Sequence, residues 1–223
     1  MTYEIELKSL LAGREAADAL RAKLLSREAK LIEQSRQLNH YFTGSALPSL
    51  AARMASHLSP GDAAQLDGIT TVARSASVRT RLLNETVLLI VKAAVDDTTS
   101  ENGIQRREFE APVAALDLRA LDDEVIAAGY QVQARWSRDR DAYRLADGTV
   151  VCIDRNAGYG YLAEFERVLD DAARAAAVEA ELRELMAALG CEELAQDRLE
   201  RMFAFYNANW SEYYGTDRTF VIE

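Results

Sequence analysis

Charged and apolar residues alternate at the beginning of the chain. In residues 3–8, which read Tyr-Glu-Ile-Glu-Leu-Lys, every second side chain is charged. Successive side chains of a β-strand point to opposite sides of its sheet, so Glu4, Glu6 and Lys8 would share one face. The pattern therefore predicts a strand with one charged face and one apolar face. The charged face turns either to water or to a space that the protein encloses.

Similar strand-like patterns recur along the chain and are separated by helical ones. Strand-like segments cover residues 3–8, 37–43, 78–83, 86–94, 105–111, 130–145, 149–154 and 160–168. Segments with apolar residues at helical spacing cover 14–25, 50–58, 63–73, 117–128, 170–189 and 192–209. Many short strands with brief connections predict an α+β fold. Its core would be one antiparallel sheet, able to close into a barrel, with helices outside it and at the C-terminus.

The composition narrows the classes of partner. The chain has 223 residues, a formal net charge of −10 and hydrophobic residues at 49% of its positions, which suits one large domain or a domain with an appendage. Nucleic acid and anionic membrane are themselves negative, so neither is an expected partner. No apolar run is long enough to span a bilayer and no signal peptide is visible, so we expect a cytoplasmic location. Cys152 and Cys191 have neither disulfide nor zinc-site spacing.

The charged strand faces carry acids and bases in nearly equal number. The acids are Glu4, Glu6, Glu108, Glu110, Asp154, Glu164 and Glu166; the bases are Lys8, Arg79, Arg81, Lys92, Arg106, Arg138 and Arg140. A sandwich whose polar faces meet solvent would also show charged faces and is the alternative at this point. Helices that cover the sheet need its apolar faces, however, so the charged faces turn inward if the sheet curls closed. Enclosed ions are costly unless they pair or bind a ligand.

Binding of a polyphosphate with its metal uses both sets of charges. Hard divalent cations such as Mg²⁺ take carboxylate oxygens, and Arg and Lys hold phosphate oxygens. Phosphoryl transfer depends mainly on positioning and charge neutralisation, so such a site could also catalyse. No Ser-His-Asp set is visible, and His40 and His57 have no partner at catalytic spacing. No glycine-rich phosphate loop of the Walker type is present.

The run Glu4-Ile5-Glu6-Leu7-Lys8 resembles the ExExK motif of the CYTH superfamily, the triphosphate tunnel metalloenzymes. The remainder of the family's motifs follows in order: Gln37-Leu38-Asn39-His40-Tyr41-Phe42, Arg79-Thr80-Arg81, Lys92, Arg106-Arg107-Glu108-Phe109-Glu110, Arg138-Asp139-Arg140 with Tyr143, Ile153-Asp154 and Glu164-Phe165-Glu166. The resemblance covers residues 1–168. It implies an eight-stranded antiparallel β-barrel that forms a tunnel, in which acids bind Mg²⁺ or Mn²⁺ and bases bind a linear triphosphate.

The resemblance also implies a role for each charged residue. The metal ligands would be Glu4, Glu6, Glu164 and Glu166, supplemented by Asp154, Glu108 and Glu110. The phosphate contacts would be Lys8, Arg79, Arg81, Lys92, Arg106, Arg138 and Arg140. Lys8 would act with a tyrosine near the second strand on the attacking water, and Tyr41 is the candidate. Arg107 would replace Arg106 on the charged face if this strand carries a bulge.

Two segments depart from the smaller members of this family. Residues 44–76 are a helical insertion, which would cover one tunnel mouth or change the substrate. Residues 169–223 are a helical extension, predicted to pack on the barrel domain of residues 1–168 and to plug, line or simply cover it. The aromatic cluster of residues 203–214 favours a core or a contact between two copies over a ligand site.

Three functions fit the pattern. The first is a metal-dependent hydrolase of inorganic triphosphate, a nucleoside triphosphate or thiamine triphosphate. The second is an adenylate cyclase, in which the ribose 3′-hydroxyl of ATP replaces water as the nucleophile. The third is a polyphosphate-binding module without catalysis. We favour hydrolysis, because a cyclase must also seat adenine and the sequence shows no set of residues for that.

Overall fold

The computed structural model describes residues 3–94 and 106–222. Its strands are β1 (Tyr3–Leu11), β2 (Lys30–Thr43), β3 (Ser75–Leu83), β4 (Thr86–Ala94), β5 (Arg106–Pro112), β6 (Gln131–Arg144), β7 (Val150–Asn156) and β8 (Gly160–Leu169). Its helices are α1 (Arg14–Ser26), α2 (Leu47–Met54), α3 (Pro60–Thr70), α4 (Leu118–Ala127), α5 (Ala175–Leu189) and α6 (Gln196–Tyr213), with a short 3₁₀ helix, η1 (Ala172–Arg174), before α5. The predicted elements are therefore present.

The strands form one eight-stranded antiparallel sheet in the order β1-β8-β7-β6-β2-β3-β4-β5. Five of its strand pairs, β2–β3, β3–β4, β4–β5, β6–β7 and β7–β8, join strands that follow one another along the chain. The predicted α+β class, with eight antiparallel strands and surrounding helices, is confirmed. The sheet is not closed within the described part of the chain, where β1 and β5 stand at the two ends of the strand order.

The chain divides into two compact units. The first unit comprises Met1–Arg36 and Ser137–Glu223, and the second unit comprises Gln37–Trp136. Strands β2 and β6 contribute residues to both units. The C-terminal helices belong to the first unit, together with β1, β7 and β8, whereas the insertion at 44–76 belongs to the second. The predicted boundary at residue 168 stays a prediction.

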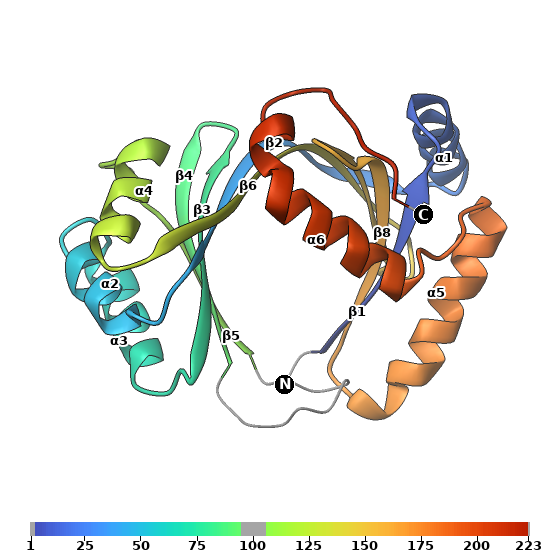
Figure 1. Ribbon diagram of the computed structural model, residues 1–223. Helices are drawn as coiled ribbons and strands as arrows, with labels where there is room; N and C mark the ends of the chain where they lie inside the picture. The colour runs from blue at the N-terminus through green and yellow to red at the C-terminus, as the bar shows by residue number, and fades with distance from the viewer. Residues whose placement is uncertain (1–2, 95–105, 223) are drawn as a thin grey trace. The chain divides into compact units, whose positions relative to one another are not determined.

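In the first unit, α1 and α5 cover one face of the sheet beside β1 and β8 (Figure 1). Alternate strand residues point into this layer and form a buried cluster with the helices: Leu7, Val151, Ile153, Ala163 and Phe165 meet Ala17, Leu20 and Leu24 of α1 and Val178, Leu182 and Met186 of α5. Burial of such side chains supplies the main stabilising term of a fold. The opposite positions of these strands are the ones that carry charge.

In the second unit, α2, α3 and α4 cover the sheet (Figure 1). The buried cluster joins Phe42, Val78, Leu89, Val91, Phe109 and Ala111 of the strands to Leu50, Met54, Leu66, Leu121 and Val125 of the helices. Ser59 and Asp117 cap the N-termini of α3 and α4, because their side-chain oxygens accept the backbone N–H groups of Asp62 and Ala120. Both units therefore bury one face of the sheet under helices.

The C-terminal extension is joined to the first unit by hydrogen bonds as well as by packing. The backbone N–H of Leu194 donates to the carbonyl of Lys8 at 2.7 Å. After α6, the tail returns to the β7–β8 turn, where Phe220 N–H donates to the Gly158 carbonyl at 2.9 Å. Aromatic rings of Tyr159, Tyr206 and Phe220 pack edge to face or tilted around this turn. These contacts join the extension to strand β1 and to the turn between β7 and β8.

Among the helices of the described residues, none combines the length and the apolar character that a bilayer crossing requires.

Replacing Gly158 by alanine is expected to loosen the C-terminal tail. Gly158 has φ +80°, and a Cβ there would lie 2.7 Å from the ring of Tyr206 and 2.9 Å from that of Phe220. Gly148 is the matched control, because it has φ +87° but a Cβ would meet nothing within 4 Å. Both alanines strain the backbone, by roughly 1–2 kcal/mol, and Gly158→Ala adds overpacking of about 1–3 kcal/mol. Urea unfolding should show the larger loss for Gly158→Ala, and equal losses would contradict the packed tail.

Candidate functional site

The charged residues predicted from the sequence lie on the sheet face opposite the helices. In the first unit, Glu6, Lys8, Asp154, Glu164 and Glu166 alternate with the buried residues under α1 and α5. The strand register places Glu6 opposite Glu166 and Lys8 opposite Glu164. Cross-strand partners lie on the same face of a sheet. The alternation in the sequence therefore brings acids and bases together on one surface.

Glu164 is the centre of an ion-pair network on this surface. The Nζ of Lys8 lies 3.2 Å from Oε1 of Glu164 and also contacts the carboxylate of Glu6. On its other oxygen, Oε2, Glu164 accepts a hydrogen bond from Nη2 of Arg140. The side chains of Glu164 and Arg140 are each 13% exposed. Charges of opposite sign thus neutralise one another in the protein without a ligand.

Asp154 extends the network to two arginines of β6. Its Oδ1 accepts from Nε of Arg140 at 2.7 Å, and its Oδ2 accepts from Nη2 of Arg140 at 2.7 Å and from Nη1 of Arg138 at 3.0 Å. Asp154 is 0% exposed, whereas the arginines are partly buried. The bidentate contact fixes the plane of the Arg140 guanidinium, which is the geometry that arginine shares with carboxylates and phosphates.

The network shifts the pKa values of its members. Burial alone would lower the pKa of Arg140, but the hydrogen bonds and charge of Asp154, with the charge of Glu164, outweigh it and raise that pKa above its ordinary value. Burial alone would raise the pKa of Glu164, but the charges of Lys8, Arg140 and Arg138 hold it below its ordinary value. Cys152, whose register partner is Glu164, has a pKa raised to about 12, chiefly by burial. At neutral pH the carboxylate is ionised and the thiol is not.

The lowered pKa of Glu164 predicts a loss of stability in acid. A carboxylate whose folded-state pKa lies below its ordinary value of 4.5 stabilises the fold fully above that pH. This contribution is lost as the pH falls through the folded-state pKa. The difference in unfolding free energy between the wild type and Glu164→Gln should therefore be largest at neutral pH and shrink below pH 4.5. A difference that stays constant over this range would contradict the network.

The second unit carries basic residues on its own charged face. The guanidinium of Arg79 lies over the ring of Tyr41, 4.6 Å from the ring centroid. The Nε of Arg79 is buried and has no hydrogen-bond acceptor in the described part of the chain. Arg81 donates to the Asn39 side chain at 2.6 Å and lies 3.6 Å from Glu110. A buried donor without an acceptor is costly, and a phosphate oxygen would satisfy it.

For the remaining predicted site residues the structure gives fewer side-chain contacts. Lys92 forms an ion pair with Glu108 at 2.9 Å. Glu4 pairs with Val168 and Arg106 with Ala94 in the strand register, but their side chains lie outside the described residues. Arg107 pairs with Ala93, on the helix-covered face, and the ladder between β4 and β5 is regular from Pro112 to Arg106. The bulge that would exchange Arg106 and Arg107 is therefore not present in this ladder.

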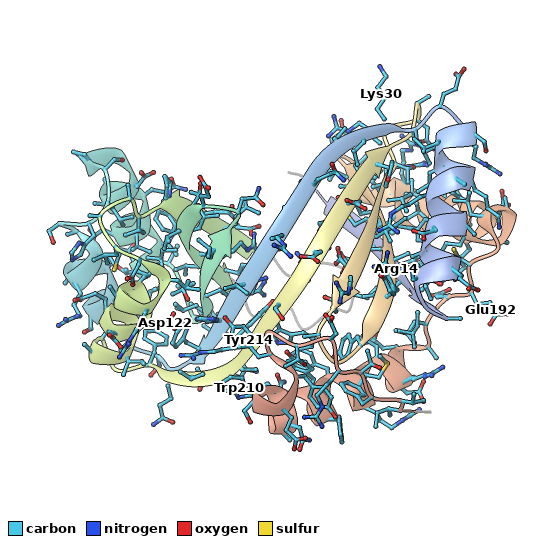
Figure 2. All side chains as sticks on the ribbon, turned by 90° about the horizontal axis from the view of Figure 1, so that it is seen from above. Arg14, Lys30, Asp122, Glu192, Trp210 and Tyr214 are labelled. Atoms are coloured by element: carbon cyan, nitrogen blue, oxygen red, sulfur yellow. The ribbon has the colours of Figure 1, made fainter. Side chains whose placement is uncertain are left out.

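A buried polar cluster was missed from the sequence. Asp122 of α4, labelled in Figure 2, accepts a hydrogen bond from Thr80 at 2.6 Å and lies 2.7 Å from Nδ1 of His40. Arg135 also donates to it at 3.2 Å. His40 thus has a carboxylate partner, but Asp122 stands between the histidine and the hydroxyl, so no nucleophile is activated as in a Ser-His-Asp set. The cluster is buried on the helix-covered face and ties α4 to the strands.

The donor set suits a hard divalent cation in type. The carboxylates of Glu6, Glu164 and Glu166 lie on paired strands, and oxygen is the ligand atom that Mg²⁺ and Mn²⁺ prefer. Across residues 3–94 and 106–222, however, no three His, Cys, Asp or Glu side chains already converge as a metal site. Lys8 and Arg140 occupy the oxygens of Glu164 instead. A cation would therefore have to displace one of these bases.

Comparison with known proteins identifies the fold. No protein-family model matches the chain, and no curated protein matches it. A proposed adenylate cyclase from Vibrio parahaemolyticus matches with a TM-score of 0.58 at 14% identity, over 91% of this chain and 98% of that chain. A conserved hypothetical protein from Pyrococcus furiosus matches with a TM-score of 0.57 at 18% identity, over 85% and 91%.

A third solved structure adds a described activity. HpAC1 from Hippeastrum, a proposed adenylyl cyclase described as having a dominant triphosphatase activity, matches with a TM-score of 0.51 at 17% identity, over 93% of this chain and 96% of that chain. At such identities the similarity establishes the fold alone. The chain shares its fold with these proteins.

Proposed function

We propose that the protein is a metal-dependent hydrolase of triphosphate-containing substrates. The observation that carries the proposal is the ion-pair network of the first unit, in which Lys8, Arg138 and Arg140 are gathered beside Glu6, Glu164 and Asp154. Charges enclosed in this way cost free energy unless they serve a ligand or one another. A linear triphosphate supplies negative charge for the bases of the network, and its cation supplies positive charge for the acids.

The acids and bases have separate tasks in this proposal. Glu6, Glu164 and Glu166 would hold Mg²⁺ or Mn²⁺, with Glu4 as a further ligand. When bound, such an ion neutralises charge on the phosphates and polarises the bond that is cleaved. Lys8 and Arg140 would exchange their contacts with Glu164 for phosphate oxygens. Substrate binding and metal binding would therefore reinforce each other.

The second unit carries its own candidate phosphate contacts. The buried Nε of Arg79 lacks an acceptor in the part of the chain that the structure describes, and a phosphate oxygen would provide one. Arg81, Lys92 and Arg106 are the other bases proposed for this role, and Glu108 and Glu110 the additional acids. Tyr41, under the guanidinium of Arg79, is the tyrosine proposed for the attacking water.

The alternative reaction is cyclisation of ATP to cyclic AMP and pyrophosphate. It uses the same triphosphate and metal, with the ribose 3′-hydroxyl in place of water. The Vibrio parahaemolyticus protein is described as a proposed adenylate cyclase and HpAC1 as having dominant triphosphatase activity, so both reactions are considered for this fold. Hydrolysis is preferred because water needs no pocket for a base.

The test is a product assay with purified protein. Tripolyphosphate, ATP and thiamine triphosphate are each incubated with Mg²⁺ or Mn²⁺, and phosphate, pyrophosphate and cyclic AMP are measured. Release of phosphate, dependent on the cation and abolished by EDTA, is the expected result. Cyclic AMP with pyrophosphate would establish the cyclase instead. Tight triphosphate binding without turnover would favour a binding module.

A further inference from the structure

We propose that Asp154 is a positioning residue for Arg138 and Arg140 and not a metal ligand. It holds the two guanidinium groups in the arrangement in which they meet a triphosphate. This inference rests on the proposed function, because it concerns the same site. It reassigns a carboxylate that the family resemblance places among the metal ligands.

The oxygens of Asp154 are already committed. They accept three hydrogen bonds, two from Arg140 at 2.7 Å and one from Arg138 at 3.0 Å. A carboxylate has about four acceptor sites in all. A cation bound here would have to displace Arg140 and would leave its guanidinium without its main partner in a buried place. The two arginines therefore neutralise the Asp154 carboxylate in the way that a bound cation would.

The strand register separates Asp154 from the acids that suit a cation. Glu166 pairs with Glu6 on β1 and with Val150 on β7. Asp154 lies four residues further along β7 than Val150, which is about 13 Å at about 3.3 Å per residue. Glu6 and Glu166 are thus direct neighbours in the register, whereas Asp154 is linked to Glu164 through Arg140, which contacts both carboxylates.

Exposure separates the two kinds of acid in the same way. The side chain of Asp154 is 1% exposed, whereas that of Glu6 is 32% exposed and that of Glu164 is 13% exposed. An ion that enters with its water shell needs carboxylates that it can reach, because Mg²⁺ loses its waters reluctantly. Arg140 lies between Asp154 and Glu164, because its Nη2 contacts both carboxylates. Asp154 is thus the more deeply buried partner and holds the arginines in position.

The test compares Asp154→Asn with Glu166→Gln in two binding measurements. Affinity for Mn²⁺ alone is measured from the electron paramagnetic resonance signal of the free ion. Affinity for tripolyphosphate at saturating Mn²⁺ is measured by calorimetry. Asp154→Asn should weaken tripolyphosphate binding about tenfold or more and change Mn²⁺ affinity less than about threefold. Glu166→Gln should show the opposite order.

A second variant tests whether Asp154 acts through the arginines. In an Arg138→Gln background, Asp154→Asn should weaken tripolyphosphate binding by a smaller factor than in the wild type, because one of the two arginines is already gone. This pair also removes one charge of each sign and is the variant to use if Asp154→Asn alone does not fold. Equal factors in the two backgrounds, or a loss of Mn²⁺ affinity with tripolyphosphate binding intact, would overturn the inference.

Failure of the proposed function gives a different result. If the wild-type protein binds and hydrolyses no triphosphate with either cation, the proposed function is wrong and the positioning role falls with it. If the wild type binds a triphosphate and Asp154→Asn loses Mn²⁺, only the positioning role is wrong.

Discussion

Replacing Glu164 by glutamine is expected to reduce triphosphate turnover at saturating metal at least about a hundredfold. The substitution keeps the size of the side chain but removes the charge that Lys8 and Arg140 share. It also removes a proposed cation ligand. The ion-pair network therefore loses its central carboxylate, and the affinity of the site for the metal falls. The measurement is the initial rate of phosphate release from tripolyphosphate across a Mn²⁺ titration.

Glu181→Gln is the matched control for this experiment. Glu181 lies on α5, is 49% exposed and pairs with Arg167. Its substitution therefore removes a surface ion pair outside the network. Exposed pairs of this kind contribute about 0–1 kcal/mol. Both variants should retain the circular dichroism spectrum of the wild type. Turnover by Glu164→Gln within a factor of about three of the wild type would exclude Glu164 from the reaction.

Arg79→Gln is expected to weaken triphosphate binding with a smaller effect on the rate at saturation. A hydrogen bond to a charged group contributes about 1.5–3 kcal/mol, which corresponds to an increase in KM of roughly 10- to 150-fold. The buried Nε of Arg79 has no acceptor among the described residues, so its removal leaves no partner unsatisfied in the ligand-free protein. Stability should consequently change little. Steady-state kinetics with tripolyphosphate separates KM from kcat.

The control for Arg79 is Arg107→Gln. Arg107 lies on β5 in the same unit, is exposed and sits on the helix-covered side of the register, opposite Ala93. It carries the same charge, so a long-range electrostatic effect would appear in both variants. A saturation curve that moves equally for Arg79→Gln and Arg107→Gln would count against a direct phosphate contact by Arg79.

Local alternation was sufficient to predict most of the strands and their charged faces. The side-chain period of a strand is two residues, so Glu6 and Lys8 had to share a face once β1 formed. The register between β1 and β8, which places Lys8 opposite Glu164 and Glu6 opposite Glu166, was not predicted from the local pattern. The apolar positions between them, such as Leu7 and Phe165, form the core that the helices cover.

Other features depend on contacts that a single sequence does not reveal. Strand β2 begins at Lys30, seven residues before the predicted start at Gln37, and its first five residues are exposed and show no buried alternation. His40 has its partner in Asp122, which lies 82 residues later on a helix. The three hydrogen bonds to Asp154 likewise require the register of β6 against β7. Such pairings are set by tertiary packing, which overrides local pattern.

The hydrogen bond from Leu194 to the carbonyl of Lys8 bears on how the protein is made. Strand β1 is synthesised first, but its sheet partner β8 and the segment at Leu194 are both near the other end of the chain. Contacts between such distant positions slow folding, because a long loop must close before they are gained. The second unit can form its core before synthesis of the chain is finished, since all its residues lie between Gln37 and Trp136. Strand β1, which carries Glu6 and Lys8, can therefore pair with β8 only after most of the chain has been synthesised. The charged surface is completed late in biosynthesis.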